Sequence, residues 1–174
     1  MLFLFLYFTG IFSSKEKWII YLSVTLFTAH LIMQLIRFDD TPNEFYLVER
    51  IVGLFNMSLF IFVNIKLLFR KEQSNIFRII GAVNVYLLFA LTGAFALEIL
   101  NIHTGKSIAG KVTLHNDDSD YAIYVYYSLV SLTTVGYGDI YPDGMAARML
   151  SVMLSAVGIL YPAVVIARLI SSKK

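Results

Sequence analysis

Cysteine is absent from the 174 residues of this chain. Its absence excludes a disulfide framework, a cysteine-based metal site and a thiol nucleophile. Charge is also scarce: Asp, Glu, Lys and Arg make up 15% of the residues, and the formal net charge of +2 is too small to indicate a nucleic-acid partner. A soluble domain needs more polar surface than this to cover itself. The few polar groups form no nucleophile–base set, so we predict that the protein is not an enzyme.

The chain is rich in hydrophobic residues. They account for 58% of the chain, and the mean hydropathy is +0.72, which predicts an integral membrane protein. A helix needs about 20 apolar residues to cross the bilayer core. Runs of that length cover residues 18–36, 51–69, 77–100 and 143–171. Residues 1–12 are apolar but too few to cross, and we expect a separate short helix there.

An aromatic run over residues 121–132 predicts one further helix. It follows an acidic cluster that offers Asp118 or Ser119 as an N-cap, and about a dozen residues cannot span a bilayer. The run starts and ends on the same side of the membrane, so we expect a re-entrant helix. The predicted fold class is therefore an all-α membrane protein, in which transmembrane helices accompany a re-entrant helix and the loop that follows it.

That loop reads TTVGYGD, from Thr133 to Asp139. Backbone that is not helical at membrane depth must be buried in protein or line water. Glycines at 136 and 138 permit positive φ at low steric cost. A strand that alternates between positive φ and its near-mirror conformation points successive carbonyls the same way, and carbonyl oxygens are hard, uncharged ligands for a cation. We expect the side chains of Val135 and Tyr137 to point away from these carbonyls and to pack against the short helix.

This arrangement resembles the pore of the potassium channel family, in which TVGYG is the established example of carbonyl-based selectivity. The resemblance implies passive, selective conduction, with K⁺ as the permeant ion. It assigns the coordination of K⁺ to Thr134, Val135, Gly136, Tyr137 and Gly138. One filter strand cannot encircle an ion, so we expect four copies of the chain to form a fourfold homotetramer in membrane lipid.

The resemblance also divides the chain into two regions. Residues 1–76 hold N-terminal transmembrane helices, with about two full spans and the short helix. The pore domain covers residues 77–174, and its parts are an outer helix (77–100), a turret (101–119), a pore helix (120–132), a filter (133–139) and an inner helix (143–171). The span at 51–69 lacks basic residues at every third position, which predicts that it carries no voltage-sensor arginines. The resemblance is therefore to a prokaryotic-type channel. No soluble ligand domain is expected from this chain.

Four residues are expected to support the filter. In the family, an acid such as Asp139 often bonds to an aromatic residue on the pore helix, and Tyr127 is the expected partner here. Val130 stands where some bacterial relatives carry a carboxylate, and Thr133 begins the motif. The alternative role for Asp139 is only to raise the density of cations at the mouth.

Gly158 and Pro162 share the inner helix. Pro162 lacks the N–H that would bond the carbonyl of Gly158, and its ring crowds that carbonyl, so the pair predicts a bend. Two interpretations stay open. The bend is a gating hinge, or it is static and Gly158 allows helices to pack closely.

Basic loops orient the spans. Residues 13–17, residues 70–78 and the C-terminal tail are basic, whereas residues 37–44 are acidic. Because basic loops face the cytoplasm, we expect a multi-pass protein of the cell membrane with a cytoplasmic C-terminus and an extracellular turret. Two alternatives are a subunit of a K⁺ uptake transporter and a non-conducting membrane sensor or scaffold. The uptake systems carry four degenerate filter loops in one chain, and this chain has one intact copy.

Overall fold

The computed structural model describes residues 43–68, 75–115 and 118–171, together with residues 21, 24, 25, 28, 29 and 32. These six residues belong to the first predicted span and are helical. The rest of that span, and the short helix expected over residues 1–12, lie outside the described residues.

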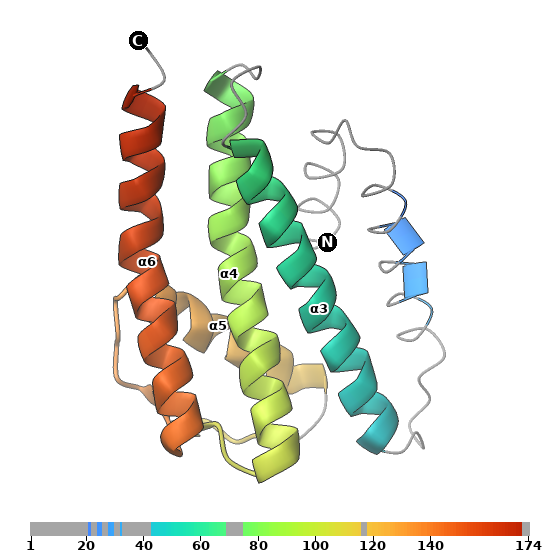
Figure 1. Cartoon of the computed structure of the whole chain (residues 1–174). Coiled ribbons are helices and arrows are strands. Elements are labelled where there is room, and N and C mark those ends of the chain that lie inside the picture. Colours follow the sequence, from blue (N-terminus) through green and yellow to red (C-terminus); the bar gives the residue numbers. More distant parts are fainter. Residues whose placement is uncertain are drawn as a thin grey trace. The chain divides into compact units, whose positions relative to one another are not determined.

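Helices dominate the described chain (Figure 1). In order, the elements are α3 (Asn43–Leu68), α4 (Asn75–Thr104), β1 (Ile108–Gly110), the 3-10 turn η1 (Asp118–Asp120), α5 (Tyr121–Leu132), β2 (Ile140–Pro142) and α6 (Met145–Ser171). α3 begins well before the predicted span at 51–69, because residues 43–50 contain neither glycine nor proline and include the strong helix formers Leu47, Glu49 and Arg50.

Three of these helices contain a segment that is long and apolar enough to cross a membrane. The segments are Leu47–Lys66, Arg78–Thr104 and Met145–Ser171. α5 has only 12 residues and is too short to cross. The predicted all-α membrane class is confirmed, and in the part of the chain that the structure describes the two three-residue strands are a minor addition.

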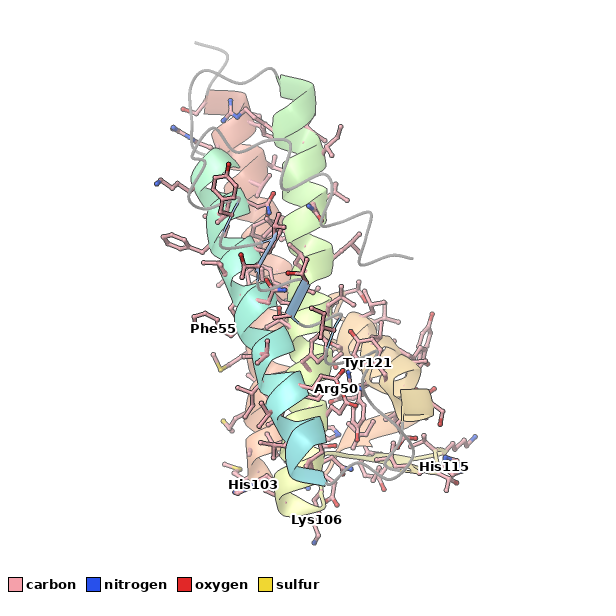
Figure 2. The ribbon with its side chains drawn as sticks, turned by 90° about the vertical axis from the view of Figure 1, so that its right-hand side faces the viewer. Arg50, Phe55, His103, Lys106, His115 and Tyr121 are labelled. Atoms are coloured by element: carbon pink, nitrogen blue, oxygen red, sulfur yellow. The ribbon has the colours of Figure 1, made fainter. Side chains whose placement is uncertain are left out.

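The chain forms two compact units, whose boundaries fall within α4 and α6: residues 1–88 with 167–174, and residues 89–166. In the first unit, α3 has one buried apolar face, which includes Met57, Phe60 and Val63. Phe55 lies on the opposite face and is 62% exposed (Figure 2). An apolar residue is stable on such a face when lipid, rather than water, surrounds it.

The second unit contains residues 89–166 and has its own core. Each of four elements contributes to it, and its buried members are Ala94 and Leu97 from α4, Ile108 from β1, Tyr124 and Tyr127 from α5, and Ala147 from α6. The buried residues of α5 are Tyr124, Tyr127, Ser128 and Leu132, a spacing that forms one face of a helix. The core therefore holds α5 in place, and with it the loop that α5 carries.

Part of the predicted turret (101–119) is helix and strand. α4 extends past the expected end at residue 100 and stops at Thr104, where Gly105 adopts a φ of 70° and donates its N–H to Asn101 O at 2.8 Å. A left-handed glycine of this kind commonly ends a helix. β1 follows almost at once and pairs antiparallel with β2, in the register Ile108↔Pro142.

Candidate functional site

The backbone of the TTVGYGD loop alternates in φ. Thr134, Gly136 and Gly138 have φ values of 59°, 56° and 77°, whereas φ is not positive at Val135 or Tyr137. The alternation expected from the glycines is therefore present, and its first positive φ, at Thr134, comes two residues before Gly136. A β-branched residue such as Thr134 is rarely found at positive φ, and such a conformation persists only where its surroundings impose it.

The last turn of α5 supplies those surroundings. Thr133 N–H donates to Leu129 O at 2.9 Å, and Thr134 N–H donates to Ser131 O at 3.1 Å. Val130 O accepts from the next two amides, at 3.1 Å from Val135 N and 3.4 Å from Gly136 N. The Thr133 hydroxyl also donates to Leu129 O at 2.7 Å. These bonds use carbonyls that a helix end leaves without partners, and Val130 contributes through its main chain.

The same bonds turn the amides of residues 133–136 toward α5. Among the described residues, none of the carbonyl oxygens of residues 134–138 accepts a hydrogen bond. All five of these residues are exposed. The C-terminus of α5, which carries roughly half a negative charge, lies at the start of the loop. The loop therefore offers a short row of uncharged oxygen ligands beside a negative helix end, an arrangement that favours a cation.

The residue that holds the C-terminal end of the loop is Tyr126. Its hydroxyl donates to Asp139 Oδ2 at 2.7 Å. This bond is the main reason that the pKa of Asp139 lies below its ordinary value, and the charge of Lys111 lowers it further. The expectation that Tyr127 bonds Asp139 is wrong. Tyr127 is buried and shares a 2.6 Å hydrogen bond with Ser151 Oγ on α6.

Helical geometry explains the error. Adjacent residues of a helix point about 100° apart, so neighbouring tyrosines cannot serve the same face. Tyr127 shares the buried face with Tyr124, three residues earlier, whereas Tyr126 is 38% exposed. The signal was present in the sequence as the periodicity of the aromatic run.

Gly158 lies against the end of α5. A Cβ atom at Gly158 would overlap the carbonyl oxygen of Leu132. Close by, the Ser155 hydroxyl donates to Ser131 O at 2.9 Å. α6 continues as one helix through Pro162. The contact supports the interpretation in which Gly158 allows close helix packing, and the hinge stays a prediction.

The comparisons with known proteins agree with this geometry. A family model described as "Ion channel" matches residues 85–172, just over half of the chain. The chain belongs to the ion channel family. The matched residues include all of α5, the filter loop and β2. The predicted resemblance to the potassium channel family is confirmed.

One curated relative of this channel is the calcium-activated potassium channel slo-1 of Caenorhabditis elegans. The two are 33% identical over 89 residues, which amount to 51% of this chain and 8% of the relative. The channel therefore matches only a small part of that relative's length. No solved structure matches the chain.

The filter side chains differ from the prediction in one respect. The sequence predicts that Val135 and Tyr137 pack against the short helix, but in the single chain they are 51% and 71% exposed. The described residues therefore cover these two residues only in part.

Small residues that the sequence analysis did not single out join α5 to its neighbours. Ser128 Oγ donates to Ala90 O on α4 at 2.6 Å. Gly93 stands beside it, where a Cβ atom would overlap the Ser128 hydroxyl and crowd Leu154. Serine and glycine inside apolar helices are typical of close helix contacts in membranes. That rule would have marked these positions as contacts, although not which helices they join.

Proposed function

We propose that this protein conducts K⁺ passively and selectively through a filter of backbone carbonyls. The observation that carries the proposal is the alternating backbone of residues 134–138, whose carbonyls accept no hydrogen bond from the described residues. Oxygens of this kind replace the water around a cation without holding it irreversibly. Thr134, Val135, Gly136, Tyr137 and Gly138 are the proposed ligands. The likeness to slo-1, itself a potassium channel, supports K⁺ as the ion.

A single chain supplies one wall of such a filter. We propose that four copies surround a common axis, because closed cyclic symmetry is the usual way for identical chains to enclose a path. The exposure of Val135 and Tyr137 supports this assembly. So does the exposure of Met149, Val152 and Met153 on α6, each at least half uncovered in the single chain. Neighbouring copies and lipid would cover these apolar side chains.

The proposed orientation follows from the basic loops, with the C-terminus in the cytoplasm and the turret outside the cell. In this orientation α5 enters the membrane from the outer side, and its C-terminus points to the inner end of the filter. Asp139 and the β1–β2 pair then lie at the outer mouth. Thr134 provides the innermost of the proposed ligands.

Ion flux from liposomes tests the proposal. Purified protein is reconstituted with K⁺ inside, and efflux is compared with that from liposomes loaded with Na⁺, with and without barium. We expect barium-sensitive K⁺ efflux, little Na⁺ efflux, and fourfold particles in electron micrographs. Equal passage of the two ions would contradict the selectivity. Absence of flux from folded tetramers would favour a sensor or scaffold instead.

A further inference from the structure

The first half of the turret belongs to the core of the second unit. Ser107 is fully buried, and Ile108 is 6% exposed. Ile108 packs in the core cluster with residues that include Ala94, Leu97 and Tyr124. Burial in a close-packed core fixes a segment far more firmly than a surface loop is fixed. The start of β1 is therefore held by the core, and the strand carries this support to the residues that it contacts.

β1 contacts the segment that leaves the filter. It pairs with β2, and the pairing extends one residue beyond each end of the strands. At one end Asp143 N–H donates to Ser107 O at 3.0 Å. At the other end Lys111 N–H donates to Asp139 O at 2.9 Å. Asp139 directly follows Gly138, so the last bond of this pairing lies one peptide unit from the outermost proposed ligand.

Gly110 makes the close approach possible. Its φ is 133°, and a Cβ atom there would overlap the carbonyl oxygen of Asp139. Gly105 and Gly144 also have positive φ, but no atom lies within 4 Å of a Cβ built at either. Glycine is therefore favoured at position 110 for two reasons: its φ is positive, and a side chain would collide with the carbonyl oxygen of Asp139. Asp139 is the residue that follows the filter.

The far end of the turret segment is fixed as well. His115 N–H donates to both carboxylate oxygens of Asp120, at 3.0 and 2.8 Å. Asp120 is 1% exposed and directly precedes α5. His115, labelled in Figure 2, therefore ties the turret to the start of the same helix whose end holds the filter. Residues 107–115 are anchored to the core, to the post-filter segment and to the pore helix.

We propose that β1 is a positioning element of the filter, which holds the main chain at Asp139 and so sets how tightly the outermost site binds its ion. The inference rests on the proposed function. Tyr126 holds the side chain of Asp139, and Lys111, the residue after β1, holds its carbonyl, so the two supports act on different atoms. A ligand atom binds well only where its support keeps it within about 0.5 Å of the right place. Lys111 and Gly110 are the residues through which β1 acts.

A pair of substitutions at one position separates the backbone bond from the charge. Lys111→Pro removes the N–H that bonds Asp139 O, whereas Lys111→Gln keeps the N–H and removes the charge. Gly110→Ala is a second variant, which forces β1 away from Asp139. The readouts are the barium concentration that halves K⁺ efflux and the ratio of Rb⁺ to K⁺ flux, each corrected for the amount of folded tetramer. We expect Lys111→Pro and Gly110→Ala to shift the barium value about fivefold, as for the loss of one hydrogen bond, and Lys111→Gln to stay near the wild type.

A measurement on the wild-type protein does not depend on the folding of any variant. Binding and positioning are reciprocal, so an ion in the outermost site must protect the bond that positions it. Hydrogen exchange of the amides of residues 107–112 should be slower in K⁺ than in Na⁺. Equal exchange in the two ions would overturn the proposal, as would unchanged barium and Rb⁺ values in conducting Lys111→Pro and Gly110→Ala tetramers. A shift in Lys111→Gln as large as that in Lys111→Pro would also overturn it. A different result would contradict the proposed function: in that case the wild-type protein itself would show no selective K⁺ flux.

Discussion

The Tyr126 hydroxyl reaches across 13 residues of sequence to donate a 2.7 Å hydrogen bond to Asp139 Oδ2. The bond connects the exposed face of α5 to the end of the filter. Moving the carboxylate away from α5 would break this bond. The side chain of Asp139 is therefore held by a residue of α5 that is not part of the buried face.

Substituting the two adjacent tyrosines should give different results. Tyr126→Phe removes the bond to Asp139, and we expect K⁺ efflux to decay faster while the tetramer stays as stable to heat as the wild type. Tyr127→Phe instead removes a buried bond to Ser151, and we expect it to lower the stability of the tetramer by about 1 kcal/mol. Flux decay and thermal unfolding of both variants test the pair. The reverse pattern would show that Tyr127 supports the filter after all.

The same bond predicts how the filter responds to acid. The pKa of Asp139 is lowered from about 3.8, mainly by Tyr126. A lowered pKa in the folded state means that the stabilisation is fully present above the ordinary value and is lost as the pH falls through the folded value. We therefore expect the contribution of Asp139 to flux to be constant from about pH 8 to about pH 5, and to be lost only below about pH 4. In Tyr126→Phe the loss should begin at higher pH, and identical acid midpoints for the two proteins would contradict the assignment.

Gly158→Ala distinguishes close packing from a hinge. Because the new methyl group would meet the carbonyl of Leu132, we expect α6 to be forced from α5 at a cost of about 1–3 kcal/mol in the stability of the tetramer. Gly81→Ala is the matched control, since a Cβ at Gly81 has nothing within 4 Å, and alanine there should stabilise the helix by about 0.5–1 kcal/mol. Thermal unfolding measures both. A Gly158→Ala tetramer of normal stability but altered open probability would support the hinge.

Gly138→Ala tests the conformation of the filter. Gly138 and Gly144 have φ values of 77° and 88°, and each has open space where a Cβ would stand. Alanine at either should therefore carry a similar conformational cost, about 1–2 kcal/mol. We expect Gly138→Ala to abolish K⁺ efflux, and Gly144→Ala to preserve it. Loss of efflux in both variants, with tetramers still folded, would mean that backbone strain rather than the filter itself is responsible.

Much of this channel could be predicted from its sequence, because strong local patterns determine it. Long apolar runs predict the membrane helices, and the glycines at 136 and 138 predict the alternating backbone. Thr134 extends that alternation, although a β-branched residue disfavours positive φ. Its positive φ depends on bonds to the end of α5, which no local pattern reveals.

The features that the sequence did not reveal depend on contacts between distant segments. β1 has only three residues, and it is a strand because residues 140–142 lie beside it. Nothing in the local sequence distinguishes Gly110 from other loop glycines. Its role depends on its contact with the carbonyl of Asp139, which the structure shows. The exposure of Val135 and Tyr137 could not be predicted either, because the sequence pattern gives the direction of a side chain but not how much of it the described residues cover. Tyr126 differs, because its position on the helix was available from periodicity.

The proposed ligands are peptide oxygens, and every amino acid brings the same oxygen to its peptide. Mutation can therefore move one of these atoms but cannot remove it or change its element. Natural variation at such a site can act only through the neighbours, which bend, brace or crowd the chain or change the charge around it. Only a synthetic change, such as an ester in place of an amide, would alter the oxygen's own strength as a ligand.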